Sequence, residues 1–277
     1  MNELRAGKLL QIVERRAAGS LRHSETYIDE NGILRCSVCR EPRRVFIEEI
    51  GKQVPVACSC SDRAENERKR QESIAFAKEK AEKCVLFDRS YNDFTFGRDN
   101  SPESAASKQC RAFVEHWEEM ERNNFGLILS GTLGTGKSYY AACIVNELRA
   151  RGVSALIVTT SRLISALRSS RDALALTDEL NTFRFLALDD VGAERNSDYV
   201  VEQLEEVINS RILARRPMVV TTNLTGQQLH EPPDVRYARI FDRILVMCPR
   251  PVILTGQSRR VDERRERAEK MKAILEA

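Results

Sequence analysis

Long apolar runs and an excess of one charge are both missing from this sequence. No apolar run approaches the ~20 residues that a membrane-spanning helix needs. Its 44 lysines and arginines face 41 acidic residues and leave a net charge of +3, so a role with nucleic acid would depend on local basic patches. The N-terminus lacks the pattern of a signal peptide, because acidic residues interrupt its amphipathic sequence. We therefore expect a cytoplasmic protein with no membrane partner.

A disulfide framework is not expected, although the chain has eight cysteines. Four of them form two close pairs, Cys36 with Cys39 and Cys58 with Cys60, and in a cytosolic protein such pairs indicate a metal. The C-x-x-C spacing is that of a zinc knuckle, and the less common C-x-C spacing is workable. Four thiolates would close a tetrahedral Zn²⁺ site, and the metal would supply the folding energy of so small a module. Free buried cysteines or a redox pair are the alternatives.

The surroundings of the cysteines predict the rest of this module. Residues 45–47 and 54–56 lie on either side of Gly51, which indicates a two-stranded hairpin. Residues 18–30 are predicted to form a polar connector. Residues 2–17 are predicted to form a helix that packs on its own domain or binds a partner. Four arginines near the cysteines either form a surface for nucleic acid or an acidic partner or are merely solvated; they are Arg35, Arg40, Arg43 and Arg44.

The middle of the chain leads from this module to a larger domain. Residues 61–83 are almost continuous helix formers whose charges nearly cancel, as in a solvated linker helix. Residues 84–96 are rich in aromatic side chains, which either wrap a nucleotide base or pack into a core. A helix is predicted to start at residues 100–103, with Pro102 in its first turn, and to continue through Met120.

Residues 131–138 have the full G-x-x-x-x-G-K-[ST] pattern of a phosphate-binding loop, in the strand–loop–helix context that the motif requires. Its glycines let the backbone approach phosphate oxygens, and the N–H groups that begin the next helix favour an anion. Lys137 would reach the β- and γ-phosphates, and the Ser138 hydroxyl would bind Mg²⁺. The predicted nucleotide contacts are Gly131, Thr132, Leu133, Gly134, Thr135, Gly136, Lys137, Ser138, Tyr139 and Asp189.

Acidic and amide side chains follow two later strands. The apolar residues 183–188 precede Asp189 and Asp190, which match the second nucleotide motif, Walker B. Asp189 would hold the Mg²⁺ shell, and Asp190 would polarise the attacking water. Residues 217–220 form another predicted strand, soon followed by Asn223. Ligands of open α/β sheets bind beyond the carboxyl ends of the strands, so Asn223 could orient the water or touch the γ-phosphate.

Two helices carry arginines with more than one interpretation. Arg239 and Arg243 have i, i+4 spacing and therefore share one helix face. They either form surface ion pairs or reach a neighbouring subunit's nucleotide, where an arginine stabilises transition-state charge. An earlier helix carries Arg162, Arg168 and Arg171, for which solvent exposure is the simplest interpretation.

Four segments together resemble the helicase-loader branch of the AAA+ ATPases, the DnaC/DnaI-like and IstB-like proteins; they are GTLGTGKS, FLALDDVGAE, VVTTN and RYARIFDRI. The resemblance covers roughly residues 85–260. The Asp-Asp pair is typical of this branch, as is the G-x-S-x-R segment that begins at Gly256. The resemblance implies an α/β fold: a P-loop AAA+ core of a parallel sheet flanked by helices, with a small N-terminal four-cysteine zinc module and a linker helix. No C-terminal lid domain is expected, because little sequence follows Arg259.

The resemblance also implies domains, cofactors and partners. The domains would be residues 1–60 for the helicase-interaction module, 61–84 for the linker and 85–277 for the ATPase. The cofactors would be ATP, Mg²⁺ and Zn²⁺. Asn223 would be a sensor residue, Arg243 the arginine finger and Arg239 its support, so the expected catalytic residues are Asp190, Lys137, Asn223, Arg243 and Arg239. The partners would be a replicative DNA helicase, further copies of the chain when ATP is bound, and single-stranded DNA, held by the helix with Arg162.

We therefore predict an ATPase that delivers a replicative helicase to single-stranded DNA. Two other functions fit the same motifs. One is an IstB-like ATPase that selects target DNA for a transposase. The other is a factor that captures a helicase and hydrolyses ATP poorly.

Overall fold

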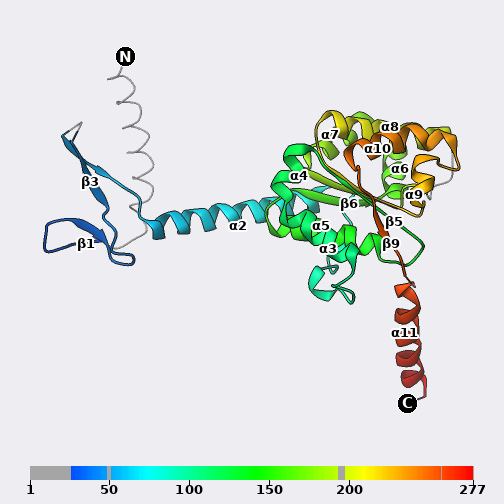
Figure 1. Cartoon of the computed structure of the whole chain (residues 1–277), viewed down its shortest axis with the longest axis horizontal. Helices are drawn as coiled ribbons and strands as arrows, with labels where there is room; N and C mark the ends of the chain where they lie inside the picture. The colour runs from blue at the N-terminus through cyan, green and yellow to red at the C-terminus, as the bar shows by residue number, and fades with distance from the viewer. Residues whose placement is uncertain (1–25, 49–50, 193–196, 257, 277) are drawn as a thin grey trace. The chain divides into compact units, whose positions relative to one another are not determined.

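The computed structural model describes residues 26–48, 51–192, 197–256 and 258–276 (Figure 1). The helix predicted over residues 2–17 lies outside the described residues. Contacts divide the chain into two compact units, Met1–Glu72 and Ser73–Ala277, which we describe separately. The domain limits expected at residues 60 and 84 stay a prediction. Among the described helices, none combines the length and the apolar character of a membrane span.

The first unit contains two β-hairpins and the start of a long helix. Strand β1 (Thr26–Ile28) pairs antiparallel with β2 (Leu34–Cys36), and β3 (Arg44–Ile47) pairs antiparallel with β4 (Lys52–Pro55). Helix α2 (Ser59–Lys83) begins here and continues into the second unit. The second hairpin and the helix confirm their predictions.

The first hairpin overturns the expected polar connector in the part of residues 18–30 that the structure describes. Its turn contains Asn31-Gly32, a dipeptide that favours tight hairpin turns, and Gly32 has a φ of 75°. The Asp29 carboxylate accepts hydrogen bonds from the N–H groups of Asn31 (3.0 Å) and Ile33 (2.9 Å). The strands are only three residues long, so their apolar pattern is too short to stand out from a connector.

The second unit is built on a five-stranded parallel sheet, which confirms the predicted α/β fold. In spatial order its strands are β6 (Ala155–Thr159), β7 (Phe185–Asp189), β8 (Met218–Thr222), β5 (Leu127–Gly131) and β9 (Val252–Leu254). Successive residues of a strand face opposite sides, so Ile128 joins one hydrophobic cluster and Leu129 joins the other. Both faces of the sheet are therefore covered, as parallel sheets require.

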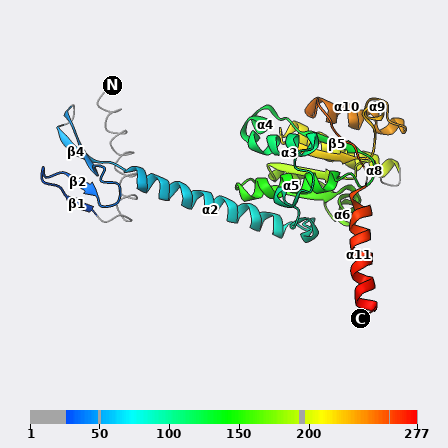
Figure 2. The same cartoon turned by 60° about the horizontal axis from the view of Figure 1, so that its bottom comes forward.

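Helices form a layer on each face of this sheet, and Figures 1 and 2 place α5 and α10 on opposite sides. One layer contains α3 (Ala105–Glu115), α4 (Trp117–Asn123) and α5 (Lys137–Ala150). The other contains α6 (Thr160–Ser169), α7 (Ala173–Thr182), α8 (Asp198–Leu213), α9 (Gly226–His230) and α10 (Ala238–Met247). Helix α11 (Arg259–Leu275) follows β9.

The helix predicted to start at residues 100–103 begins later than expected. Ser104 is its N-cap and accepts a hydrogen bond from the N–H of Ser107 (3.1 Å), so α3 starts at Ala105. The helix also does not run through Met120, because His116 ends α3 and precedes α4. A serine cap competes well with a proline as a helix start because its hydroxyl satisfies an otherwise unpaired N–H.

Candidate active site and metal centre

The phosphate-binding loop joins β5 to α5. Gly131 ends the strand, Gly136 is the N-cap of the helix in a left-handed conformation (φ 98°), and Lys137 is the first helical residue. The Lys137 side chain is only 5% exposed, and its Nζ donates to the carbonyl oxygens of Gly131 and Thr132, at 2.8 Å each. The ammonium group is therefore already held inside the loop, where a bound anion would meet it.

Two glycines of this loop are required by its neighbours. A Cβ atom on Gly131 would lie 2.3 Å from the carbonyl oxygen of Leu254, at the end of the adjacent strand β9. A Cβ atom on Gly134, which has a φ of 81°, would lie 1.9 Å from Oγ of Ser258. Ser258 of the G-x-S-x-R motif thus packs against the phosphate loop, a role that the sequence motif did not indicate.

Asp189 and Asp190 end β7 in two different environments. The Asp189 side chain is 2% exposed, and its carboxylate accepts hydrogen bonds from the hydroxyl groups of Thr221 (2.6 Å to Oδ1) and Tyr91 (3.0 Å to Oδ2). Asp190 is exposed, has a φ of 61°, and donates its N–H to Oγ1 of Thr221 (2.8 Å). The Asp189 carboxylate is therefore fixed in place inside the protein, whereas Asp190 lies at the surface just beyond the carboxyl end of β7.

The sheet gathers the predicted nucleotide residues at one edge. Ser130 of β5 is in register with Thr222 of β8, so Asn223 follows its strand next to the start of the phosphate loop. Asn223 is exposed there. Strand β7, which carries both aspartates, is the other neighbour of β8. The carboxyl ends of these strands therefore bring together the loop, two aspartates and an amide, where open α/β sheets bind their ligands.

The aromatic residues upstream of the sheet pack beside the loop helix. Tyr91 and Phe96 are buried in the same hydrophobic cluster as α5, which favours core packing over contact with a base. Phe94 lies with its ring 5.5 Å from that of Tyr139, the residue after the loop. The Tyr139 hydroxyl donates to the carbonyl oxygen of Thr95 (2.6 Å). These contacts fix the start of α5 from outside the sheet.

The two candidate interface arginines differ in their contacts. Arg243 of α10 donates to Oε1 of Glu205 on α8 at 2.6 Å, with both side chains partly exposed. Arg239, one turn earlier, is exposed. The surface ion pair weighed for these arginines thus forms at Arg243, and the helix that carries both is anchored through its buried face, which includes Ile240 and Ile244.

Of the three arginines predicted on one helix, Arg162 and Arg168 lie on α6 and have partners within the chain, whereas Arg171 lies beyond the end of α6 at Ser169. Arg162 donates to Oδ2 of Asp88 (3.1 Å) and to the carbonyl oxygens of Phe87 (3.0 Å) and Val85 (3.3 Å). The Arg168 guanidinium lies 5.1 Å from the centre of the Tyr199 ring. Arg162 is exposed, as the simplest interpretation expects, but its guanidinium also fastens the segment that precedes η2 (Arg89–Tyr91).

The four paired cysteines lie together in the first unit. Their sulfur atoms are all within 4.8 Å of one another, with Cys60 at 3.1 Å from Cys58, 3.4 Å from Cys36 and 3.5 Å from Cys39. Zn–S bonds of about 2.3 Å would place tetrahedral sulfurs about 3.8 Å apart, so the cluster fits a metal of this size. The sequence pairs thus form one candidate metal centre.

The acidity of these thiols also fits a metal. Burial acts to raise the pKa of Cys58, but hydrogen bonds with Cys60 and Ser61 lower it to about 6. Hydrogen bonds with Cys58 and Cys36 raise the pKa of Cys60 to about 12. The sulfurs are thus too close for all four to ionise without a cation, because each thiolate opposes the next.

Arg43 supports this cluster from inside. Its side chain is fully buried, and its guanidinium donates to Sγ of Cys58 (3.0 Å) and to Oγ of Ser61 (3.2 Å). Arg35 pairs with Asp29. The solvated and partner-binding interpretations are therefore wrong for Arg43, which places its charge against a cysteine sulfur, whereas Arg40 and Arg44 are exposed.

The comparison with known families agrees with this geometry. The family model described as "IstB-like ATP binding protein" matches residues 59–267. The chain belongs to this family. The match spans the P-loop, both aspartates and the arginines of α10, so the family's ATP-binding character applies to the second unit.

Two proteins that are similar to this chain are named replicative helicase loaders. The loader DnaC of Escherichia coli K12 is 31% identical over 144 residues, which are 50% of this chain and 56% of that protein. The loader DnaI of Bacillus subtilis 168 is 30% identical over 161 residues, which are 53% of this chain and 51% of that protein. The chain thus spans about half the length of the relatives it matches.

Solved structures of similar proteins share the fold of the second unit. A crystal structure of DnaI has a TM-score of 0.52 at 28% identity, covering 62% of this chain and 93% of that one. A crystal structure of the DnaC helicase loader also has a TM-score of 0.52, at 20% identity, covering 61% of this chain and all of that one (100%). The AAA+ core predicted for this family member is therefore confirmed.

Proposed function

We propose that the chain is an ATP-dependent loader that binds a replicative DNA helicase and delivers it to single-stranded DNA. The proposal rests on one observation. In a domain about 30% identical to two named helicase loaders, the carboxyl ends of the parallel strands carry a full set of candidate nucleotide-binding residues, and we call this part of the sheet the nucleotide edge. That edge unites the phosphate loop with Asp189 and Asp190. Such a protein would work in the cytoplasm of a bacterium, where its helicase and DNA are.

Each polar group of the nucleotide edge has a proposed part in ATP hydrolysis. The N–H groups of residues 131–138 and the Lys137 ammonium would bind the phosphates, and Ser138 with Asp189 would hold Mg²⁺. Mg²⁺, when bound, would neutralise charge on the β- and γ-phosphates. Asp190 would accept a proton from the attacking water, and Asn223 would orient it. The exposure of Asp190 suits this part, because a general base must reach the water.

A second copy of the chain would complete the site. We assign Arg243, supported by Arg239, to the nucleotide of a neighbouring subunit, where its charge would stabilise the transition state. In the isolated chain Arg243 binds Glu205 at 2.6 Å, so that pair would have to open when subunits assemble. Partly exposed pairs of this kind are worth only about 1 kcal/mol or less, so opening is a small cost. Nucleotide binding would thus control the assembly.

Two other regions of the chain would bind the helicase and the single-stranded DNA. Zn²⁺ on Cys36, Cys39, Cys58 and Cys60 would fold the module that binds the helicase. Arg168 and Arg171 are the proposed contacts for single-stranded DNA. Contacts of arginine with phosphates predict that DNA binding weakens steeply with salt.

The test is delivery of a bacterial replicative helicase, from the organism that encodes this chain, onto circular single-stranded DNA. With ATP, the wild-type chain should increase the amount of helicase on DNA at least about 10-fold. Lys137→Ala should abolish the ATP-dependent part, because a P-loop lysine binds the β- and γ-phosphates. Lys78→Ala is the control, since this lysine lies on α2 outside the loop. Delivery that survives Lys137→Ala would contradict an ATP-driven loader.

The match to the IstB-like family also supports a second candidate function. An IstB-like ATP-binding protein could instead select target DNA for a transposase, and the motifs of the nucleotide edge serve both functions equally. The cysteine module favours the loader. A chain that binds a transposase encoded beside it, and no helicase, would decide for the alternative.

A further inference from the structure

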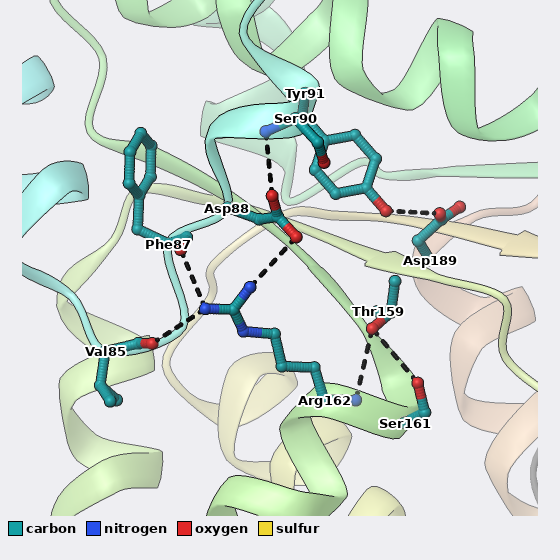
Figure 3. A network of polar contacts seen from close by, with 9 residues as sticks. All are labelled: Val85, Phe87, Asp88, Ser90, Tyr91, Thr159, Ser161, Arg162 and Asp189. Atoms are coloured by element: carbon teal, nitrogen blue, oxygen red, sulfur yellow. Dashed lines mark hydrogen bonds and ion pairs between the residues drawn. The ribbon is translucent and has the colours of Figure 1, made fainter.

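The Asp189 carboxylate is held by a residue from an unexpected part of the chain. Figure 3 shows the Tyr91 hydroxyl pointing at Asp189, at a distance of 3.0 Å from Oδ2. The other oxygen, Oδ1, accepts from the Thr221 hydroxyl at 2.6 Å. Each oxygen of this nearly buried carboxylate therefore has a donor of its own, and the two donors together fix its orientation.

Tyr91 is held on the side of the loop helix. It ends η2, is 8% exposed and lies in the hydrophobic cluster of α5. Nδ2 of Asn146, on α5, donates to the carbonyl oxygens of Tyr91 (2.7 Å) and Phe94 (2.9 Å). The same helix begins with Lys137. Any displacement of Tyr91 would therefore be resisted by the helix that carries the phosphate loop.

Tyr91 is also held on the side of α6. The Asp88 carboxylate caps η2 by accepting from the N–H of Ser90 (2.9 Å), and its second oxygen accepts from Arg162 (3.1 Å). Arg162 lies in the first turn of α6, directly after β6. Figure 3 shows the contacts from Arg162 to Asp88 and from Asp88 to Ser90, the residue before Tyr91. The phenol is thus fixed between two helices that flank the nucleotide edge.

The Tyr91 phenol is the hydrogen-bond donor in this contact, and the Asp189 carboxylate is the acceptor. A hydrogen bond to an ionised carboxylate is roughly twice as strong as a neutral one. Phenylalanine would fill the same space without this donor.

We propose that Tyr91 is a positioning residue of the nucleotide site, whose hydroxyl orients the Asp189 carboxylate toward Mg²⁺ bound with ATP. The inference rests on the proposed ATP-binding function and deepens it. Groups that orient a metal's carboxylate ligands typically change metal affinity 10- to 100-fold when removed. The effect of losing Tyr91 should therefore fall on the Mg²⁺-dependent part of nucleotide binding and spare the metal-free part.

The experiment measures binding of a fluorescent, non-hydrolysable ATP analogue to the full chain, in a Mg²⁺ titration and in excess chelator. For Tyr91→Phe we expect the half-saturating Mg²⁺ concentration to rise about 10-fold. Its affinity for the analogue in chelator should equal that of the wild type. The Mg²⁺ dependence of turnover should move by the same factor.

Tyr140→Phe is the matched control. Tyr140 lies in the same hydrophobic cluster, and its hydroxyl also donates to a carboxylate, that of Asp99 (3.1 Å). It should lose a similar amount of thermal stability without a change in Mg²⁺ dependence. Wild-type Mg²⁺ dependence in Tyr91→Phe overturns the inference, and so does an equal shift in both variants.

Two further readouts keep the test decisive. If Tyr91→Phe does not fold, Arg162→Gln is used instead, because it removes the hydrogen bonds that hold the segment before Tyr91. A raised Mg²⁺ requirement in this variant supports the inference, and an unchanged requirement overturns it. A wild-type chain that binds no analogue with Mg²⁺ would instead refute the proposed ATP-binding function. Failure of the inference alone would leave Mg²⁺-dependent binding in the wild type intact.

Discussion

Replacing Asp190 with asparagine should lower ATP turnover at least about 100-fold, because a positioned general base typically contributes 10²–10⁴-fold. Nucleotide affinity should stay near that of the wild type, since the phosphate loop is unchanged. The fold should also stay intact. Asparagine tolerates the positive φ of 61° at this position and keeps the N–H that donates to Thr221. Steady-state hydrolysis and binding of a non-hydrolysable analogue measure the two quantities.

Asp178→Asn, on the exposed surface of α7, is the matched control and should keep wild-type turnover. Mixing Asp190→Asn with Arg243→Ala adds a test of the shared site. Each variant should be nearly inactive alone, but the mixture should recover a measurable part of the activity. In the mixture an intact Asp190 and an intact Arg243 can meet across one interface. No recovery, or wild-type turnover in Asp190→Asn, would contradict the proposed division of roles.

Stripping the proposed Zn²⁺ from the cysteine cluster with a chelator should unfold the hairpins of the first unit and leave the second unit folded. The hairpins have only short strands, whereas structural Zn²⁺ sites contribute apparent binding free energies of about 10–16 kcal/mol. We therefore expect about one Zn²⁺ per wild-type chain and none in Cys58→Ser. Hydrogen exchange should show loss of protection in β1–β4, and helicase binding should fail with it. The second unit should keep its melting temperature, because it has its own hydrophobic core.

Cys84→Ser is the control for this experiment. Cys84 is a buried thiol of the second unit outside the cluster, so its loss should leave the zinc content unchanged. Hairpins that remain protected from exchange in a strong chelator would show that metal does not hold the module together. Zinc retained by Cys58→Ser would remove this cysteine from the site.

Local patterns predict much of this molecule. The phosphate loop can be found from eight consecutive residues because its chemistry depends on backbone and side chains that are adjacent in sequence. Asp189 and Asp190 can be found because a parallel strand is a continuous apolar run, and its end marks the edge of the sheet. The second hairpin is also predictable, because a glycine lies between two β-forming segments.

Contacts between distant segments are the part that local patterns miss. Tyr91 meets Asp189 across almost a hundred residues, and in the sequence it is only one of several aromatic residues near the linker. Ser258 lies in a recognisable motif, but its contact with Gly134 depends on how β9 ends beside β5. Arg43 resembles its exposed neighbours in sequence, and only the folded module shows that it is buried against Cys58.

The left-handed backbone at Asp190 implies a trade-off between the proposed catalytic carboxylate and the thermal stability of the protein. A left-handed conformation costs most residues about 1–2 kcal/mol; Asp and Asn tolerate it better than other residues, and glycine avoids the cost. Selection of variants for heat resistance alone would therefore favour Gly at position 190. Variants without the carboxylate would bind ATP but hydrolyse it poorly. A screen for thermal stability would therefore enrich proteins that stay in the nucleotide-bound state.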